Sequence, residues 1–335
     1  MPNLKSIRPL DAVIAGLVIA VLALGGYLGY SVWVQRRSVV ASTAPSRAVA
    51  QVEAQVRANP NNLDARMRLA QALAVAGRSP DAIGQYEAAL KIRKEYPPAL
   101  SGIGFIALQE KDYAAGEKYF RRVVGILEPK RTNGPDAQLE TAYFYLGTAL
   151  MEQKEYEEAA NYYKRALLLR RDASDTHYAL AFTYSKLGLD SKYREELENT
   201  LLFDPKMPEA NYDYAKLLLK DGDKATAAEH LRTSITAAPH IQLPKTALDE
   251  LGPFSTRLAA ARRVQASDLK AALVEARIAV ALEPKNAVAA VLLGDLYAKS
   301  GDKTKAAAAY EQALTVEPDN ASAKAGLGKV TTNGK

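Results

Sequence analysis

Small residues recur along this chain at a nearly constant interval. The positions are Ala70, Gly104, Gly147, Ala181, Ala215, Ala260, Gly294 and Gly328. Five of the seven intervals between them are 34 residues, and the other two are 43 and 45, which equal 34 with insertions of 9 and 11. Such a period is typical of a repeat protein, in which each repeat is one supersecondary unit that packs on its neighbours. We therefore expect an extended surface for binding another protein and no closed catalytic pocket.

Three further columns of residues keep the same period. Another column of small residues comprises Ala48, Ala82, Gly116, Ala159, Ala227, Ala272 and Ala306. Larger apolar residues follow four positions later, at Val52, Tyr86, Phe120, Tyr163, Leu197, Leu231 and Tyr310. Prolines end the units at Pro60, Pro205, Pro239, Pro284 and Pro318. Two apolar stripes at helical spacing, separated by a turn such as Gly301-Asp302, predict an antiparallel helix pair in each unit.

The motifs resemble the tetratricopeptide repeat (TPR) family over roughly residues 63–328. The resemblance is carried by Leu146-Gly147 with Ala159, Tyr163 and Ala166, and by Leu293-Gly294 with Ala306, Tyr310, Ala313 and Pro318. It implies an all-α fold, an α-solenoid of about seven TPR helix hairpins forming a superhelix over 48–330. The expected units are 63–96, 97–130, 140–173, 174–207, 208–241, 253–286 and 287–320. An unpaired helix is expected over 46–59 and a closing helix over 321–330, followed by a tail at 331–335. The insertion 242–252 is compatible with one short extra turn of helix.

In that family, one face of each first helix lines a concave groove that holds a peptide. The spacing in the unit 174–207 buries His177, Leu180, Ala181 and Tyr184 and turns other residues toward that face. Carried over by the resemblance, the partner-binding residues are Phe105, Phe144, Thr148, Tyr178, Phe182, Tyr212 and Lys216. Aromatic residues beside cations suit an apolar or amphipathic protein or peptide segment. Packing between repeats is the alternative role of these aromatic residues.

The first residues suggest a membrane anchor. After a short tail at 1–11, residues 12–34 contain no charge and as a helix would be about 35 Å long, enough to span a bilayer. The expected interface residues are Tyr27, Tyr30, Trp33, Arg36 and Arg37, and residues 35–47 form a linker. We therefore predict a single N-terminal transmembrane helix before the solenoid, favoured over a cleavable signal, and a single-pass membrane localisation. The flanking charges leave the side of the array open, and Gly25 and Gly29 form a possible self-association motif.

The sequence gives little evidence for catalysis, metal binding or nucleic-acid binding. The chain has no cysteine, and its histidines, His177, His230 and His240, lack further ligands at metal-binding spacing. The net charge of +6 arises from 44 basic and 38 acidic residues that alternate along the helices, which disfavours nucleic acid as a partner. We predict no cofactor, no metal, no nucleic-acid binding and no enzyme activity.

The function predicted from these features is a non-enzymatic, membrane-tethered scaffold. It would bind a polypeptide partner during assembly, secretion or maturation of a membrane or exported complex. The alternative is a fixed structural subunit of a membrane complex, whose groove is permanently filled by one neighbour.

Overall fold

The computed structural model describes residues 44–131 and 134–331, and the regular elements within these ranges are helices. The prediction of an all-α fold built of helix hairpins is therefore confirmed for the described part of the chain. The two ranges belong to two compact units, and each is described by itself.

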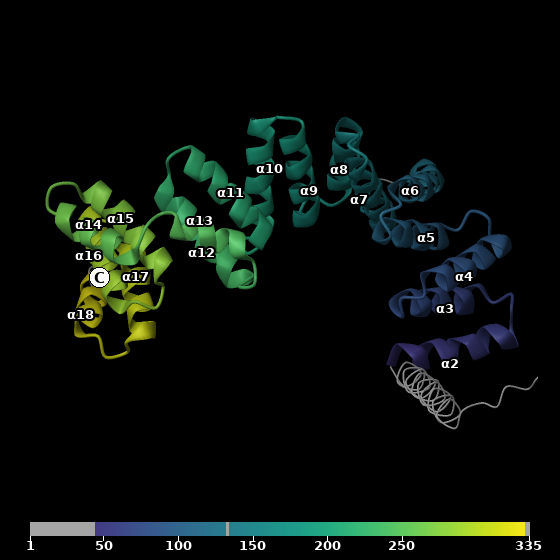
Figure 1. Ribbon diagram of the computed structural model, residues 1–335, viewed down its shortest axis with the longest axis horizontal. Coiled ribbons are helices and arrows are strands. Elements are labelled where there is room, and N and C mark those ends of the chain that lie inside the picture. The colour runs from purple at the N-terminus through teal and green to yellow at the C-terminus, as the bar shows by residue number, and fades with distance from the viewer. Residues whose placement is uncertain (1–43, 132–133, 332–335) are drawn as a thin grey trace, which may run out of the picture. The chain divides into compact units, whose positions relative to one another are not determined.

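The first unit consists of an initial helix and two helix pairs (Figure 1). Its elements are α2 (Ala44–Ala58), α3 (Leu63–Val75), α4 (Ser79–Ile92), α5 (Pro97–Gln109), α6 (Tyr113–Leu127) and the 3-10 helix η1 (Glu128–Lys130). Helix α2 packs on α3, and α4 packs on α5. The two hairpins of the first unit therefore pack on each other, and α2 packs on the first of them.

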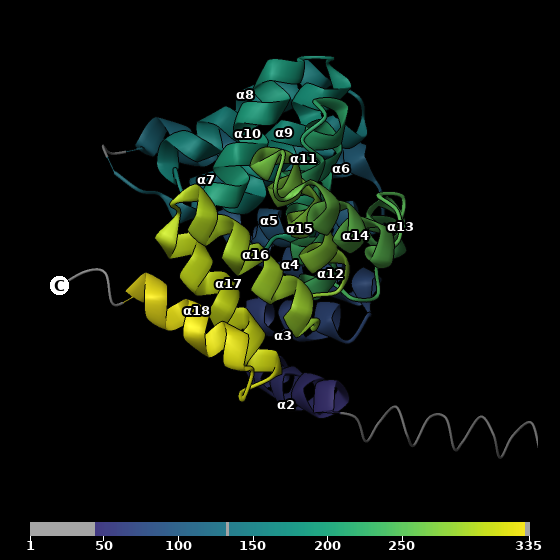
Figure 2. The same cartoon turned by 90° about the vertical axis from the view of Figure 1, so that its left-hand side faces the viewer.

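The second unit contains five more pairs and two single helices. The pairs are α7 (Ala137–Glu152) with α8 (Tyr156–Leu169), α9 (Ser174–Lys186) with α10 (Asp190–Phe203), α11 (Pro208–Lys220) with α12 (Lys224–Ala237), α14 (Phe254–Val264) with α15 (Leu269–Leu282), and α16 (Ala287–Ser300) with α17 (Lys303–Val316). The single helices are α13 (Gln242–Asp249) and α18 (Ala321–Thr331). Helix α18 lies beside α16 and α17 and ends the stack, as Figure 2 shows.

The columns of small and large residues meet inside each hairpin. A Cβ atom added at Gly104 would lie 2.9 Å from the ring of Phe120, and one added at Gly147 would lie 2.9 Å from the ring of Tyr163. Gly294 stands in the same relation to Tyr310, at 2.6 Å. The glycine of the first helix is therefore a packing requirement, because it leaves room for the aromatic ring of the second.

Aspartates begin several of the second helices. Asp112, Asp223, Asp268 and Asp302 each accept a hydrogen bond from a backbone N–H in the first turn that follows. Before Asp302, Gly301 has φ of 85°, a left-handed conformation that glycine adopts without strain. The Gly/Asp turn thus ends one helix and caps the next.

A polar side chain near the start of the first helix braces several hairpins. It hydrogen-bonds a main-chain carbonyl six residues earlier and a polar side chain on the second helix. The residues are Arg66, which bonds Pro60 and Gln85; His177, which bonds Arg171 and Glu196; Asn211, which bonds Pro205 and His230; and Arg257, which bonds Leu251 and Glu275. These contacts tie the loop between repeats to both helices of the hairpin.

The insertion after α12 changes the stacking of the helices. At the other junctions within each unit, the second helix of a pair packs on the first helix of the next, as α8 does on α9 and α15 on α16. Helix α12 instead packs on α13 and on α15, which is the second helix of the following pair. The eight-residue helix α13 accounts for the extra helical turn expected over 242–252.

The membrane prediction requires correction. Residues 12–34, the interface residues Tyr27, Tyr30, Trp33, Arg36 and Arg37, and the pair Gly25 and Gly29 lie outside the described residues. Within 44–131 and 134–331, no helix combines the length and apolar character needed to cross a bilayer. The predicted single-pass membrane localisation, which rested on the length and lack of charge of one stretch, is overturned by this finding.

Candidate functional site

Helix α9 presents its side chains in the register that the sequence predicts. His177, Leu180, Ala181 and Tyr184 are buried, and Phe182 on the neighbouring face is 36% exposed. Helices α7, α9 and α11 are the first helices of three consecutive pairs in the second unit (Figure 1). They carry six of the seven predicted partner-binding residues, and Phe105 belongs to α5 in the first unit.

Tyr178 connects α9 to α11. Its hydroxyl donates a hydrogen bond to Oδ2 of Asp213 at 2.9 Å, and Lys216 lies 2.6 Å from Oδ1 of the same carboxylate. Burial, followed by the charge and hydrogen bond of Asp213, raises the pKa of Tyr178 and keeps the phenol a neutral donor. Tyr178 also packs against the buried cluster around Ala181 and Leu197. Tyr178 therefore has a packing role between repeats, whatever else it contacts.

Two aromatic and cation pairs lie on successive first helices. The Lys186 ammonium lies 4.7 Å from the centre of the Phe182 ring, and Lys216 lies 5.0 Å from that of Tyr212. Both lysines are exposed, whereas Tyr212 is half-buried. An apolar ring beside a cation on an exposed helix face is suited to an amphipathic partner that carries an acidic group.

Phe144 and Thr148 lie on α7 and are half-buried. The Thr148 hydroxyl donates to the Phe144 carbonyl at 3.0 Å and accepts from the Tyr163 hydroxyl at 3.2 Å. Phe144 packs at a tilt against Tyr163, with 5.8 Å between ring centres. Thr148 is therefore used within its own hairpin, while Phe144 also borders a pocket.

That pocket lies between α7, the start of α9 and the loop before it. It has a volume of about 180 Å³ and is lined by Glu140, Thr141, Phe144, Tyr145, Arg170, Asp175 and Thr176. Except for Phe144, these residues were not among those singled out from the sequence. Glu140 is only 8% exposed and Thr176 1% exposed, so two polar groups are buried at its wall.

A comparison of the repeats with one another could have revealed this pocket. Glu140 is the first residue of its unit, where other units have Leu63, Pro97, Ser174, Pro208, Pro253 and Ala287. Thr176 stands at the third position, which is alanine in five other units, namely Ala65, Ala99, Ala142, Ala210 and Ala289. These alanines are all buried. Glu140 and Thr176 thus place polar groups where the repeat otherwise favours small, apolar or rigid residues.

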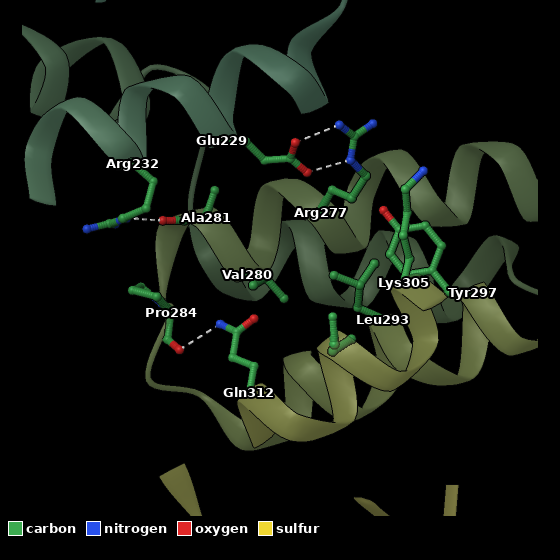
Figure 3. Close-up of a pocket in the computed structure, with 12 residues that line it drawn as sticks. Glu229, Arg232, Arg277, Val280, Ala281, Pro284, Leu293, Tyr297, Lys305 and Gln312 are labelled. Carbon is green, nitrogen blue, oxygen red and sulfur yellow. Dashed lines mark hydrogen bonds and ion pairs between the residues drawn. The ribbon is translucent and has the colours of Figure 1, made fainter. Parts of the chain in front are cut away.

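A second and larger pocket follows from the contact of α12 with α15 (Figure 3). Its volume is about 340 Å³, and Val280, Ala281, Leu293 and Ala309 provide apolar wall. At its rim Arg277 forms a bidentate ion pair with Glu229, at 2.6 and 2.8 Å. Arg277 pairs with Glu229, and Arg232 donates to the main-chain carbonyl of Leu282. These side chains therefore hold α12 and α15 together, and we interpret the pocket as part of that structural contact.

The described residues contain no group of three or more histidine and acidic side chains placed to hold a metal ion. His177 and His230 instead bond to Glu196 and Asn211 within their hairpins.

Comparison with known families identifies the repeats. Three models, each described as tetratricopeptide repeat, match residues 37–99, 95–172 and 287–320. Together they cover about half of the chain. The resemblance to the tetratricopeptide repeat family is thereby confirmed.

Solved structures also resemble this chain. YrrB, described as a TPR protein with an unusual peptide-binding site, is 17% identical with a TM-score of 0.47, over 60% of this chain and 98% of YrrB. The pilF protein of Pseudomonas aeruginosa is 17% identical with a TM-score of 0.46, over 78% of this chain and 95% of its own. MamA from Desulfovibrio magneticus RS-1 is 18% identical with a TM-score of 0.46, over 53% and 95%. At such identities a likeness concerns the fold alone.

Proposed function

This chain is a tetratricopeptide repeat protein, and we propose that it is a non-enzymatic scaffold that binds a polypeptide segment along the first helices α7, α9 and α11. The segment is apolar or amphipathic and carries an acidic group near the lysines. The scaffold acts in the assembly, secretion or maturation of a larger complex.

The observation that carries this proposal is the pair of aromatic and cation contacts, Phe182 with Lys186 and Tyr212 with Lys216. They lie on consecutive first helices, and both lysines are exposed; Lys216 also pairs with Asp213, and no such carboxylate lies beside Lys186 in the described ion pairs. A ring at the surface contributes apolar area to a partner at little cost in side-chain entropy. The nearby ammonium group is partly held by the ring, so less ordering is required when an acidic group binds.

Phe182 is the most informative position to test. It is 36% exposed, and it is not part of the buried clusters found in the described ranges. Removing its ring therefore changes the surface more than the core. Tyr178 is less suitable, because its bond to Asp213 would be lost as well.

The test uses the full chain as bait for a displayed library of random peptides. We expect the wild-type protein to enrich peptides that combine apolar and acidic residues. Phe182→Ala should weaken their binding by about tenfold, the usual effect of losing a central aromatic contact. Helical content and the midpoint of thermal unfolding should stay unchanged.

The matched control is Leu202→Ala on α10 of the same hairpin. Leu202 is 70% exposed on the second helix, so its removal should leave peptide binding unchanged. Equal affinity of wild type and Phe182→Ala, or an equal loss in both variants, would refute the proposed binding face.

A pull-down from cells distinguishes the two kinds of scaffold: one stoichiometric partner indicates a fixed subunit, and a range of partners indicates an assembly factor.

A further inference from the structure

The pocket between α7 and α9 contains a carboxylate with few partners. Glu140 is 8% exposed, yet its hydrogen-bonding and ion-pair partners are distant. Arg170 lies 3.4 Å from Oε1, and the Thr141 hydroxyl lies 3.5 Å from Oε2. The Arg170 side chain is 54% exposed, so solvent screens this ion pair. A buried carboxylate is costly unless it accepts strong hydrogen bonds, and Glu140 has capacity for more.

A second buried group lines the same pocket. Thr176 is 1% exposed, and its hydroxyl oxygen is the one buried side-chain polar atom without a hydrogen-bond partner in the described part of the chain. Leaving a buried hydroxyl unpaired costs free energy, and nearly all such groups in folded proteins find a partner. This observation is independent of the acidic residues and indicates a ligand group that can bond to a hydroxyl.

The charged residues that line the pocket indicate whether the ligand is a cation or an anion. Its walls include two carboxylates, Glu140 and Asp175, and one guanidinium, Arg170. Burial, with the negative charges of Asp175 and Glu140, raises the pKa of the neighbouring Tyr145. The first turn of α9 attracts anions, but Asp175 already occupies it. The excess of negative charge therefore favours a cation.

The size and neighbourhood of the pocket select the kind of cation. A volume of about 180 Å³ is smaller than the roughly 300 Å³ or more of typical small-molecule sites, and it suits the end of one side chain. Phe144, one of the residues expected to contact a partner, forms part of the wall. An ammonium group has three donors, which match the carboxylates and the threonine oxygen, and its alkyl stem can pack on an aromatic ring.

We propose that this pocket binds the side-chain ammonium of a lysine in the polypeptide segment that lies along α7 and α9. Glu140 and Asp175 accept two hydrogen bonds, Thr176 accepts the third, and Phe144 contacts the alkyl stem. This inference rests on the proposed function, because it assigns one subsite of the same binding face. It adds a basic residue to the apolar and acidic features of the partner.

The direct test uses a small probe and does not need a partner. The full chain carries isotope-labelled threonine methyl groups and is titrated with N-acetyl-lysine methylamide, followed by NMR at Thr176. We expect the Thr176 signal to shift at about tenfold lower concentration of this probe than of N-acetyl-norleucine methylamide, which lacks the charge. Equal responses to the two probes, or no response to either, would show that the pocket holds solvent only and would overturn the inference.

Two variants assign the response to the pocket. Glu140→Gln keeps the shape of the side chain and removes its charge, and should weaken the lysine probe by about tenfold or more. Glu157→Gln, which alters an exposed glutamate of α8 in the same hairpin, changes the net charge equally and should leave the response unchanged. Thr176→Val removes one of three acceptors, so it should weaken the probe less than Glu140→Gln does. An undiminished response of Glu140→Gln would overturn the assignment.

The peptide library separates this inference from the proposed function. Peptides enriched by the wild type should contain a lysine that peptides enriched by Glu140→Gln lack, while both sets keep the features that depend on Phe182. Enrichment with no preference for lysine would overturn the subsite and leave the binding face intact. A lysine response at Thr176 without any enriched peptide would support the subsite and refute the proposed binding face.

Discussion

His177 and Glu196, which lie on the two helices of one hairpin, approach each other to 2.6 Å between Nδ1 and Oε2. The other ring nitrogen, Nε2, lies 2.9 Å from the main-chain carbonyl of Arg171. Both neighbours are acceptors, and only a doubly protonated imidazole can donate to both. Burial alone would lower the pKa of His177, but the hydrogen bonds to Glu196 and Arg171 and the charge of Glu196 raise it.

This arrangement makes the stability of the second unit dependent on pH. Because the pKa of His177 is raised on folding, its contribution is complete below the unfolded value of about 6.5 and is lost as the pH rises through the folded value. We expect His177→Gln to reduce the free energy of unfolding by roughly 1 kcal/mol more at about pH 5.5 than at about pH 9. Urea denaturation of both proteins at the two pH values measures the difference.

His230 provides a control of opposite sign. Burial lowers the pKa of His230, so its contribution to stability is present above about pH 6.5 and declines as the pH falls. The cost of His230→Gln should therefore be greater at the higher pH. A cost of His177→Gln that does not vary with pH would show that the His177 ring is not charged in the folded protein.

The glycine and aromatic pairs give a prediction about packing. In the first unit, Gly104 lies against Phe120, which is 1% exposed, and an added methyl group would come within 2.9 Å of the ring. Since the ring is enclosed, Gly104→Ala should destabilise the protein by about 1–3 kcal/mol. Gly84 lies in a helix of the same unit and has no atom within 4 Å of the added Cβ position. Gly84→Ala should stabilise by about 0.5–1 kcal/mol. Thermal and urea unfolding measure both, and a stabilised Gly104→Ala would contradict the packing shown here.

The sequence was sufficient to predict the columns to which these residues belong, because both members of each pair recur with the repeat period. Periodicity placed Gly104 and Phe120 in two recurring columns and assigned Leu180 and Tyr184 to the buried face of α9. Local spacing determines which face of a helix is apolar, and the repeat determines which helix it meets.

Polar contacts between helices were not predicted in this way, because the spacing of apolar residues does not identify the partner of a polar side chain. The partner of His177 lies 19 residues away on another helix, and its second bond goes to a main-chain carbonyl. Similarly, the length of the insertion at 242–252 does not reveal that α12 will pack on α15. The role of Tyr178 was left open because its hydroxyl partner, Asp213, is on the next first helix.

Two arginines that join α12 to α15 should differ in their contributions. Arg232 donates to the carbonyls of Ala281 and Leu282 at 2.5 and 2.8 Å and so satisfies the C-terminal end of α15. Arg277 instead pairs with Glu229, whose side chain is 47% exposed (Figure 3). We expect Arg232→Met to cost about 1–3 kcal/mol, because polar groups at a helix end lose their donor. Arg277→Met should cost about 1 kcal/mol or less.

The effect of salt on the free energy of unfolding distinguishes the two arginine contacts. The ion pair of Arg277 is partly exposed, so its contribution should fall when urea denaturation is repeated at about 1 M NaCl. The Arg232 contribution should change less, since its acceptors are neutral carbonyls. If both variants cost the same at low salt and lose the same amount at high salt, Arg232 acts through its charge and not through the end of α15.

Thr176 and Thr183 offer a comparison of two buried hydroxyls on one helix. Thr176 is 1% exposed and its hydroxyl has no partner, whereas Thr183 is 0% exposed and donates to the Ala179 carbonyl at 2.8 Å. Valine has nearly the shape of threonine and a similar helix propensity, so each substitution mainly removes the hydroxyl. Thr176→Val should stabilise the free protein by about 1 kcal/mol, because an unpaired buried hydroxyl is removed. Thr183→Val should destabilise it by about 0.5–1.5 kcal/mol through loss of a hydrogen bond. Urea denaturation measures both, and a destabilised Thr176→Val would mean that this hydroxyl is already paired in the free protein, which would remove the main support for a ligand at the pocket.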